Sequence, residues 1–496
     1  MKLPFRRREP EPVVVDNPNW NSYDPSSAEA PTGAGSQTDE SHKHHFSEDR
    51  PNGLEDPEKA GEGVAHGGVA KVGYKGKQDP FGDEEGAETK YRTMEWWQAG
   101  MIMIAETISL GILSLPSVLA AIGIVPGIIL IAGLGLVATY TGFVLGQFKL
   151  RYPHVHNMAD AGEILLGPIG REIFGAAQII FLIFVMGSHV LTFSIMLNVI
   201  SDHGTCTIVF GVVGMIVCLI FTLPRTLKKV SYLSIASFIS IISAVMITMI
   251  GIGIEHPGKK VDATVHTSLA KGFLSVTNII FAYAGHVAFF SFISELKVPE
   301  QYPKALYLLQ GVDISMYIIV AIVVYRYGGP DVASPALGST GHIVRKVAYG
   351  IAIPTIVIAG VINGHVAAKY IYVRIFRGTG MMGKKSLASY GSWMIICLIL
   401  WVIAWIIAEA IPVFNDLLSL ISSLFASWFT YGLSGIFWLF MNKGLWFSSP
   451  RKIFLSIVNL CIFGMGAAIC GLGLYASGKA IHDQPGGGSF SCADNS

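Results

Sequence analysis

Eleven apolar stretches follow one another between Trp96 and about residue 476, and short polar segments separate them. Each stretch is long enough to cross the hydrocarbon core of a bilayer, about 30 Å thick, as an α-helix. They are too long for the strands of a membrane barrel, which need only about ten residues. The sequence therefore predicts an all-α polytopic membrane protein with about eleven transmembrane helices, at approximately 98–121, 124–147, 172–199, 205–223, 230–254, 272–295, 304–327, 343–371, 390–411, 413–440 and 452–476.

The charged residues are concentrated before the first apolar stretch. Residues 1–95 contain 12 of the chain's 35 Lys and Arg residues and 19 of its 34 Asp and Glu residues, together with many Pro and Gly residues. A segment of this composition buries too little apolar surface to offset the conformational entropy of the chain. We therefore predict a disordered N-terminal tail over 1–95, a transmembrane domain over 96–476 and a short C-terminal tail over 477–496.

The basic residues between the predicted spans indicate the orientation of the chain. If the N-terminus is cytosolic, the connections on the cytosolic side hold 16 Lys and Arg residues, and those on the other side hold 7. Cytoplasmic loops of membrane proteins carry such an excess of Lys and Arg. The pattern favours a cytosolic N-terminus and, because the number of spans is odd, a C-terminus on the outer side.

The sequence contains no motif of a common enzyme or metal site. No Walker A, HExxH or GxSxG motif occurs, so ATP-driven pumping and intramembrane hydrolysis are unsupported. We predict that the chain is not an enzyme and holds no metal or other cofactor. Its six cysteines are too scattered for a CxxC motif. Cys206 and Cys492 could both face an oxidising compartment, but we do not predict a disulfide between them.

Two predicted spans contain residues that interrupt helices near their centres. The first carries Gly111 and Pro116 within ETISLGILSLPS, and the sixth carries Ala284 and Gly285 within IIFAYAGHVAFF. Gly loosens a helix and Pro removes a hydrogen-bond donor, so we expect both spans to be broken near the bilayer midplane. Broken spans one and six are typical of a transporter with a five-plus-five inverted repeat. The alternative is that these residues serve close helix packing alone.

Three ionisable residues deep within the predicted spans are candidates for proton coupling. Glu106 lies five residues before Gly111, Asp313 lies midway through the seventh span, and His286 follows the second break. Ionisable groups inside a membrane are costly to bury and usually functional. We hypothesise that Glu106 binds a proton from one side and releases it to the other, with His286 and Asp313 as further candidates. A static hydrogen bond or ion pair is the alternative for each residue.

Other polar residues of the spans are expected to have structural roles. His189 and His365 have small neighbours, which favours an interhelical hydrogen bond for each. Glu295 and Glu409 lie near the ends of spans. Acidic side chains at such positions ordinarily extend to the membrane interface, and we expect both to do so.

A family resemblance is carried by the stretch Asp79–Ser117, which reads DPFGDEEGAETKYRTMEWWQAGMIMIAETISLGILSLPS. It resembles the amino acid/auxin permease family, and within it the fungal neutral amino acid permeases of the methyltryptophan-resistance type. The similarity extends from about Asp79 to about residue 476. The resemblance implies a LeuT-like fold, secondary active import by proton symport, and neutral aliphatic and aromatic L-amino acids as substrates.

The resemblance also implies which residues contact the substrate. The first break would present backbone amides to the substrate carboxylate, and the second would present carbonyls to its ammonium group. The implied substrate contacts are Thr107, Ser109, Leu110, Gly111, Ile112 and Leu113 from the first span and Phe281, Ala282, Tyr283, Ala284 and Gly285 from the sixth. Weaker candidates for lining the pocket are Ser188, Thr192 and Thr355.

The coupling ion, the membrane and the direction of transport have alternatives. Thr355 has no second Ser or Thr beside it at the centre of the eighth span, which favours protons over sodium. We expect the plasma membrane, with a vacuolar exporter of the same family as the alternative. Two alternative functions are not transport by a carrier: an amino acid sensor that signals through residues 1–95, and a passive channel. The expected partners are neutral L-amino acids and the lipid bilayer, without nucleic acid, and the oligomeric state is left open.

Overall fold

The computed structural model of this chain describes residues 91–225, 227–255, 258–377, 379, 381–382, 386–483 and 489–495. The predicted disordered tail lies almost entirely outside the described residues, so the division into a tail, a transmembrane domain and a C-terminal segment stays a prediction. Every regular element in the described ranges is helical. The prediction of an all-α protein is confirmed.

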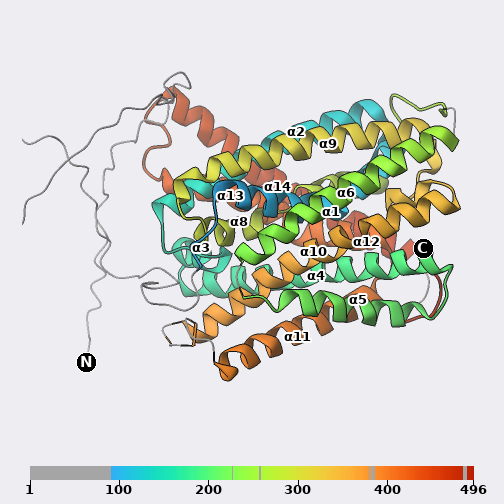
Figure 1. Cartoon of the computed structure of the whole chain (residues 1–496). Coiled ribbons are helices and arrows are strands. Elements are labelled where there is room, and N and C mark those ends of the chain that lie inside the picture. The colour runs from blue at the N-terminus through green and yellow to red at the C-terminus, as the bar shows by residue number, and fades with distance from the viewer. Residues whose placement is uncertain are drawn as a thin grey trace, which may run out of the picture. The chain divides into compact units, whose positions relative to one another are not determined.

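The helices follow the predicted spans closely, and Figure 1 shows their arrangement. They are α1 (Trp96–Ile122), α2 (Ile124–Arg151), α3 (Met158–Leu166), α4 (Pro168–Ser201), α5 (Thr207–Thr222), α6 (Leu227–Glu255), α7 (Leu269–Ala282), α8 (His286–Ser294), α9 (Tyr302–Gly328), α10 (His342–Phe376), α11 (Leu387–Ala410), α12 (Phe414–Ile421), the π-helical η4 (Ser422–Gly432), α13 (Leu433–Met441) and α14 (Pro450–Asp483). Short 3-10 turns are η1 (Pro299–Gln301), η2 (Gly329–Asp331) and η3 (Ala336–Ser339).

Ten helical segments of the described residues are long and apolar enough to cross a membrane. The fourth predicted span, α5, is helical but has only 16 residues, which rise about 24 Å along the helix axis. The short helix α3 between the second and third spans was not predicted. Its N-cap is Asn157, whose side chain accepts a hydrogen bond of 3.0 Å from the amide of Asp160.

The helices differ strongly in how deeply they are buried. The central parts of α1, α4, α7–α8 and α10 are almost wholly enclosed by protein, whereas most of α14 is exposed. Helices α2 and α9 run side by side, and α5 packs beside α11 on the opposite side of the bundle (Figure 1). The enclosed helices therefore form the interior in which a polar site is shielded from lipid.

The predicted break in the sixth span is present. Helix α7 ends at Ala282, α8 begins at His286, and three residues in a turn join them. The amides of Tyr283 and Ala284 donate to Ile280 and Phe281 carbonyls at 3.2 and 3.0 Å, so the turn is partly satisfied within itself. A break here is tolerated because all three turn residues are buried in protein rather than exposed to lipid.

The predicted break in the first span is wrong for this structure, because α1 is helical through both Gly111 and Pro116. Gly111 serves close packing instead. A Cβ at this position would lie 2.6 Å from the Cα of Ala282, so only glycine lets α1 approach α7 this closely. Hydroxyls of Ser114 and Ser117 donate to carbonyls of the same turns at 2.9 and 2.8 Å, which supports the helix around the proline.

The expectation that Glu295 reaches the membrane interface is also wrong. Glu295, at the end of α8, is fully buried and pairs with Lys369 of α10, which is 2% exposed. The ring of Tyr91 lies 4.4 Å from the Lys369 ammonium group. The segment before α1 is held at the same place, since Met94 exchanges backbone hydrogen bonds with Glu295 and Lys297 at 3.0 and 2.9 Å. This end of the broken span is therefore closed by a buried ion pair.

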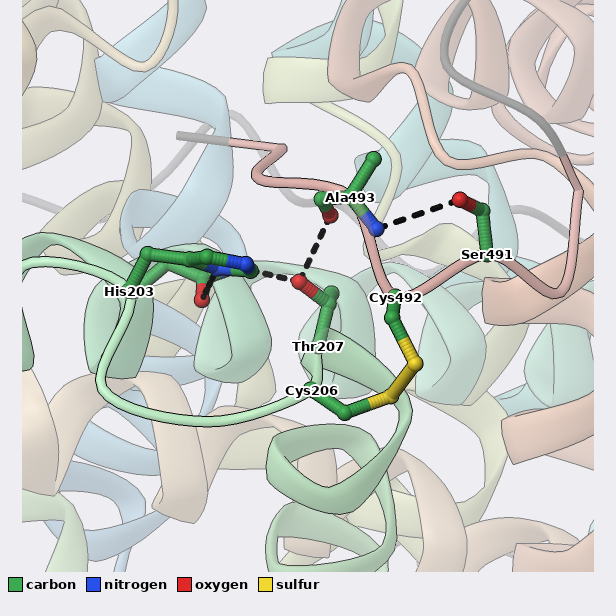
Figure 2. The surroundings of a disulfide bond; sticks show 7 residues. His203, Cys206, Thr207, Ser491, Cys492 and Ala493 are labelled. Carbon is green, nitrogen blue, oxygen red and sulfur yellow. Dashed lines mark hydrogen bonds between the residues drawn. A yellow bond between two sulfur atoms is a disulfide. The ribbon is translucent and has the colours of Figure 1, made fainter.

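Two further expectations fail at the opposite ends of the helices. Glu409 is only 7% exposed, and its carboxylate lies against Gly211 of α5 instead of reaching the interface. Cys206 and Cys492 form a disulfide, which we did not predict (Figure 2). Their 286-residue separation gives no local signal in the sequence. The bond exists because the C-terminal residues return to the connection between α4 and α5.

Substitution of Gly111 tests its role in packing. We expect Gly111→Leu to lower the melting temperature of the detergent-purified protein, because overpacking typically costs about 1–3 kcal/mol. Gly133→Leu on α2 is the matched control, since Gly133 is exposed and no atom lies within 4 Å of its added Cβ. Equal melting temperatures for the two variants would contradict the close approach of α1 and α7.

Substitution of Lys369 tests the buried ion pair. Lys369→Met leaves the Glu295 carboxylate buried without its partner, and we expect a loss of about 3–5 kcal/mol in stability. The double variant Glu295→Gln/Lys369→Met should recover most of that loss. Lys297→Met is the control, because the Lys297–Glu95 pair is about half exposed and worth under about 1 kcal/mol. Thermal unfolding of the four proteins measures the difference, and a Lys369→Met variant as stable as Lys297→Met would refute the assignment.

Candidate functional site

A small cavity of about 20 Å³ lies where α1, α4 and the α7–α8 break meet. This volume holds about one water molecule. It is too small for an amino acid, so binding one requires these helices to separate. The lining residues are Glu106, Thr107, Leu110, Phe181, Val185, His189, Phe281, Ala284 and Gly285.

Six of the residues expected at the site line this cavity. Three come from α1, namely Glu106, Thr107 and Leu110, and three come from the end of α7 and the break, namely Phe281, Ala284 and Gly285. The break and α1 are in intimate contact, because a Cβ on Gly285 would lie 2.6 Å from Glu106 Oε2 and 2.9 Å from Thr107 Cγ2. The absence of a side chain at position 285 is thus what lets the Glu106 carboxyl face the break.

The remaining expected contacts are buried around the cavity but do not line it. Ser109 donates to the carbonyl of Thr355 at 3.3 Å, and Tyr283 donates to the carbonyl of Ile131 at 3.0 Å. Gly111 and Ala282 form the close contact between α1 and α7. Two more, Ile112 and Leu113, belong to the apolar core.

The backbone amides at the centre of the first span already donate hydrogen bonds within its helix. Since α1 is continuous, the backbone amides from Ser109 to Leu113 bond along the helix instead of facing a substrate. The helix N-terminus at the site is instead that of α8, which begins directly after Gly285 and whose Ala288 amide already donates to the Gly285 carbonyl at 3.1 Å. A helix N-terminus of this kind attracts a carboxylate.

Three lining residues on α4 were not expected at the site. Phe181, Val185 and His189 recur every four residues and so share one face of the helix. His189 was expected to make an interhelical hydrogen bond, and it does: its Nδ1 lies 2.8 Å from the Ile356 carbonyl of α10. The four-residue spacing was visible in the sequence, but only the packing of α4 against α1 identifies this face as the lining one.

The two deep carboxyls lie on α1 and α9, which pack against each other. Glu106 Oε2 is buried, and both oxygens of Asp313 are buried, with no hydrogen-bond partner among the described residues. Asp313 lies on α9 within electrostatic range of Glu106. One turn along, the hydroxyl of Tyr317 donates to the Ala282 carbonyl at 2.7 Å, so this face of α9 packs against the break. The pair of carboxyls therefore flanks the α7–α8 turn.

His286 starts α8, but its ring does not line the cavity. Its Nε2 lies 3.1 Å from the Thr141 hydroxyl and 2.9 Å from the Ala138 carbonyl, both on α2. The other predicted structural histidine, His365, packs edge-on against Trp393 with ring centroids 5.3 Å apart. The geometry thus separates His286 from the carboxyls with which it was grouped.

The weaker candidates also lie outside the cavity. Ser188 and Thr192 donate to carbonyls of their own helix at 2.7 and 2.8 Å. The hydroxyl of Thr355 accepts from Ser237 at 3.2 Å. These hydroxyls are satisfied by neighbouring helices or by their own backbone.

Comparison with known proteins agrees with this architecture. Residues 92–478 match the family described as transmembrane amino acid transporter protein. The N amino acid transport system protein of Neurospora crassa is 36% identical over 437 residues, which cover 84% of this chain and 92% of that protein.

Solved structures share the fold at low sequence identity. MhsT in complex with L-phenylalanine aligns with a TM-score of 0.52 at 12% identity, over 78% of this chain and all of that one. The nucleobase-cation-symport transporter MHP1 aligns with a TM-score of 0.51 at 15% identity, over 83% and 98% of the two chains. The predicted LeuT-like fold is confirmed.

The family match covers nearly all of the described helices, and the relative from Neurospora crassa is matched over most of its length. The site has the form that such proteins require, a broken helix enclosed at the centre of a helical bundle. Both observations describe a multi-pass membrane carrier rather than an enzyme. The chain belongs to the transmembrane amino acid transporter family.

Proposed function

We propose that this chain imports neutral aliphatic and aromatic amino acids by proton symport. The observation that carries the proposal is that two deep carboxyls, neither of which forms an ion pair with a basic residue of the described ranges, lie by an apolar cavity at the α7–α8 break. Leu110, Phe181, Val185 and Phe281 provide the apolar lining. Such walls suit an uncharged side chain, because a cationic one would need an acidic partner of its own, and we assign the acids near the cavity, Glu106 and Asp313, to coupling.

The two ends of the break supply the groups that bind the amino acid backbone. The N-terminus of α8 attracts the substrate carboxylate. The last carbonyls of α7 already accept from the Tyr283 and Ala284 amides and from the Tyr317 hydroxyl, so each offers its second lone pair to the ammonium group. Entry of the substrate separates α1 from the break, and the Glu106 carboxyl at this contact responds to that movement. A carboxyl that is protonated when exposed to one side and deprotonated when exposed to the other couples the two fluxes.

Protons rather than sodium suit the groups near the centre. The one hydroxyl considered for sodium, that of Thr355, is occupied by Ser237 at 3.2 Å. The carbonyl of Thr355 is occupied by Ser109 at 3.3 Å. We therefore assign coupling to Glu106 and Asp313, with Glu106 as the residue nearest the break.

The proposed orientation has a cytosolic N-terminus in the plasma membrane. The excess of basic residues on one side supports it. The Cys206–Cys492 disulfide lies at the opposite side, where the C-terminus ends, and such bonds persist in oxidising compartments. A vacuolar lumen is the alternative outer compartment, and the direction of net flux in cells separates the two.

Uptake by the purified protein in liposomes tests the proposal. An inward gradient of about one pH unit stores about 1.4 kcal/mol per proton, enough for about tenfold accumulation of leucine or tryptophan with one proton per substrate. We expect Glu106→Gln to abolish this accumulation while leucine exchange without a gradient continues. His286→Gln is the control, because its ring contacts α2 and not the cavity.

Other outcomes separate the competing readings. Accumulation that survives Glu106→Gln but not Asp313→Asn moves coupling to α9. Accumulation driven by a sodium gradient alone rejects proton symport. Binding of leucine without accumulation under any gradient rejects transport and favours a sensor, and flux that only dissipates a gradient favours a channel.

A further inference from the structure

A second and much larger cavity lies at the outer ends of α4, α10 and α11. Its volume is about 410 Å³, compared with about 20 Å³ at the central site. This size falls within the range of about 300–1,000 Å³ that is usual for small-molecule sites. None of the residues expected at the transport site lines this outer cavity.

The wall of the outer cavity includes a segment that we call the strap, residues 489–495. The disulfide ties it to the α4–α5 connection at Cys206, and the Thr207 hydroxyl donates to the Ala493 carbonyl at 2.7 Å (Figure 2). At its two ends, the Phe490 amide donates to the Glu409 carbonyl at 3.0 Å, and Asn495 bonds to Asn198 and Ser194 at 2.8 and 3.1 Å. The strap is thus fastened to α4, α5 and α11 at once.

The lining of the outer cavity combines both signs of charge with apolar surface. Arg345 of α10 lines it, and its buried Nε has no hydrogen-bond partner among the described residues. Asp494 on the strap lines it as well, and Glu409 contributes from α11 although its carboxylate lies against Gly211. The apolar part of the lining includes Leu191, Tyr349, Phe414 and Phe490. A guanidinium group for a carboxylate, the Asp494 carboxyl for an ammonium group and apolar walls together match a neutral amino acid zwitterion.

The outer cavity lies beyond the central site along α4, the helix that lines both. On α4, His189 lines the central cavity and Leu191 lines the outer one, about 3 Å farther along the helix. On α10, Arg345 and Tyr349 precede the Thr355 and Ile356 carbonyls that bond to Ser109 and His189. Those two hydrogen bonds join α10 to α1 and α4 farther along α10 than the residues that line the outer cavity, so a substrate from the outer side meets the large cavity first.

We propose that the outer cavity is a second binding site, which holds a neutral α-amino acid before it passes to the central site, and that the strap forms its outer wall. This proposal rests on the proposed function, since it assigns the same substrate class to a separate place. Loss of the strap or of Arg345 weakens binding from outside without removing the central site or its coupling carboxyls.

Cysteine variants test the role of the strap. We expect Cys206→Ser and Cys492→Ser to raise the KM for leucine uptake into cells equally, by about tenfold, with the maximal rate within about twofold. A membrane-impermeant phosphine reductant added outside should produce the same rise in the unmodified protein and no further rise in either variant. Cys461→Ser is the matched control, because Cys461 is an exposed free cysteine away from the strap. An unchanged KM in both strap variants overturns the role of the strap.

Charge variants and binding stoichiometry test the site itself. We expect Arg345→Gln to raise the KM by about tenfold, as loss of a charge-assisted hydrogen bond does. Arg345→Lys should restore part of the affinity. Arg326→Gln is the control, because Arg326 donates to the Lys259 carbonyl outside the cavity. Equilibrium binding of labelled leucine to the full-length purified protein should give two sites, and one site in Arg345→Gln.

The outcomes distinguish this proposal from the proposed function. If the unmodified protein transports leucine but binds one molecule, and Arg345→Gln has an unchanged KM, the outer site is rejected and the symporter stands. If the unmodified protein neither binds nor transports neutral amino acids, the proposed function itself is rejected, and the outer site with it.

Discussion

The structure depends first on the absence of hydrogen-bond partners in the hydrocarbon core, which forces every backbone polar group to be satisfied within the protein. Most of the described chain meets this requirement as long helices. The turn between Ala282 and His286 is the exception at the centre, and it is enclosed by α1, α2, α4 and α9. The same constraint encloses two helix ends, the C-terminus of α7 and the N-terminus of α8, whose opposite dipole poles can attract the charged groups of a ligand.

The polar side chains obey the same constraint. Glu295 is buried with Lys369, at the end of α8 away from the break. The Glu106 carboxyl, which lines the cavity, and the Asp313 carboxyl have no such cation. A carboxylate paired with a buried cation is held in its charged form, whereas a carboxyl without a basic partner is suited to the proton exchange that we propose. This contrast is the physical reason why we assign a structural role to Glu295 and propose a coupling role for Glu106 and Asp313.

The two cavities are lined by two different sets of helices. The central cavity belongs to α1, α4 and the broken span, whereas the outer one belongs to the ends of α4, α10 and α11 with the strap. Helix α4 contributes to both, and its hydrogen bond from His189 to α10 lies between them. Movement of α1 and the break away from α4 would enlarge the central cavity without detaching the strap, because the strap is bonded only to helices outside the moving pair.

The sequence alone determined the fold class, the eleven helical stretches and the break at Gly285, because hydropathy and helix-breaking residues act over a few neighbouring positions. Its glycine at 111 was misread as a break, since close packing against Ala282 and unwinding leave the same local signal. Pairings over long separations, such as Glu295 with Lys369 and Cys206 with Cys492, were decided by the tertiary structure. The tertiary structure also decided that His286 contacts α2, because the residues near it in the sequence do not indicate which distant helix its side chain will contact.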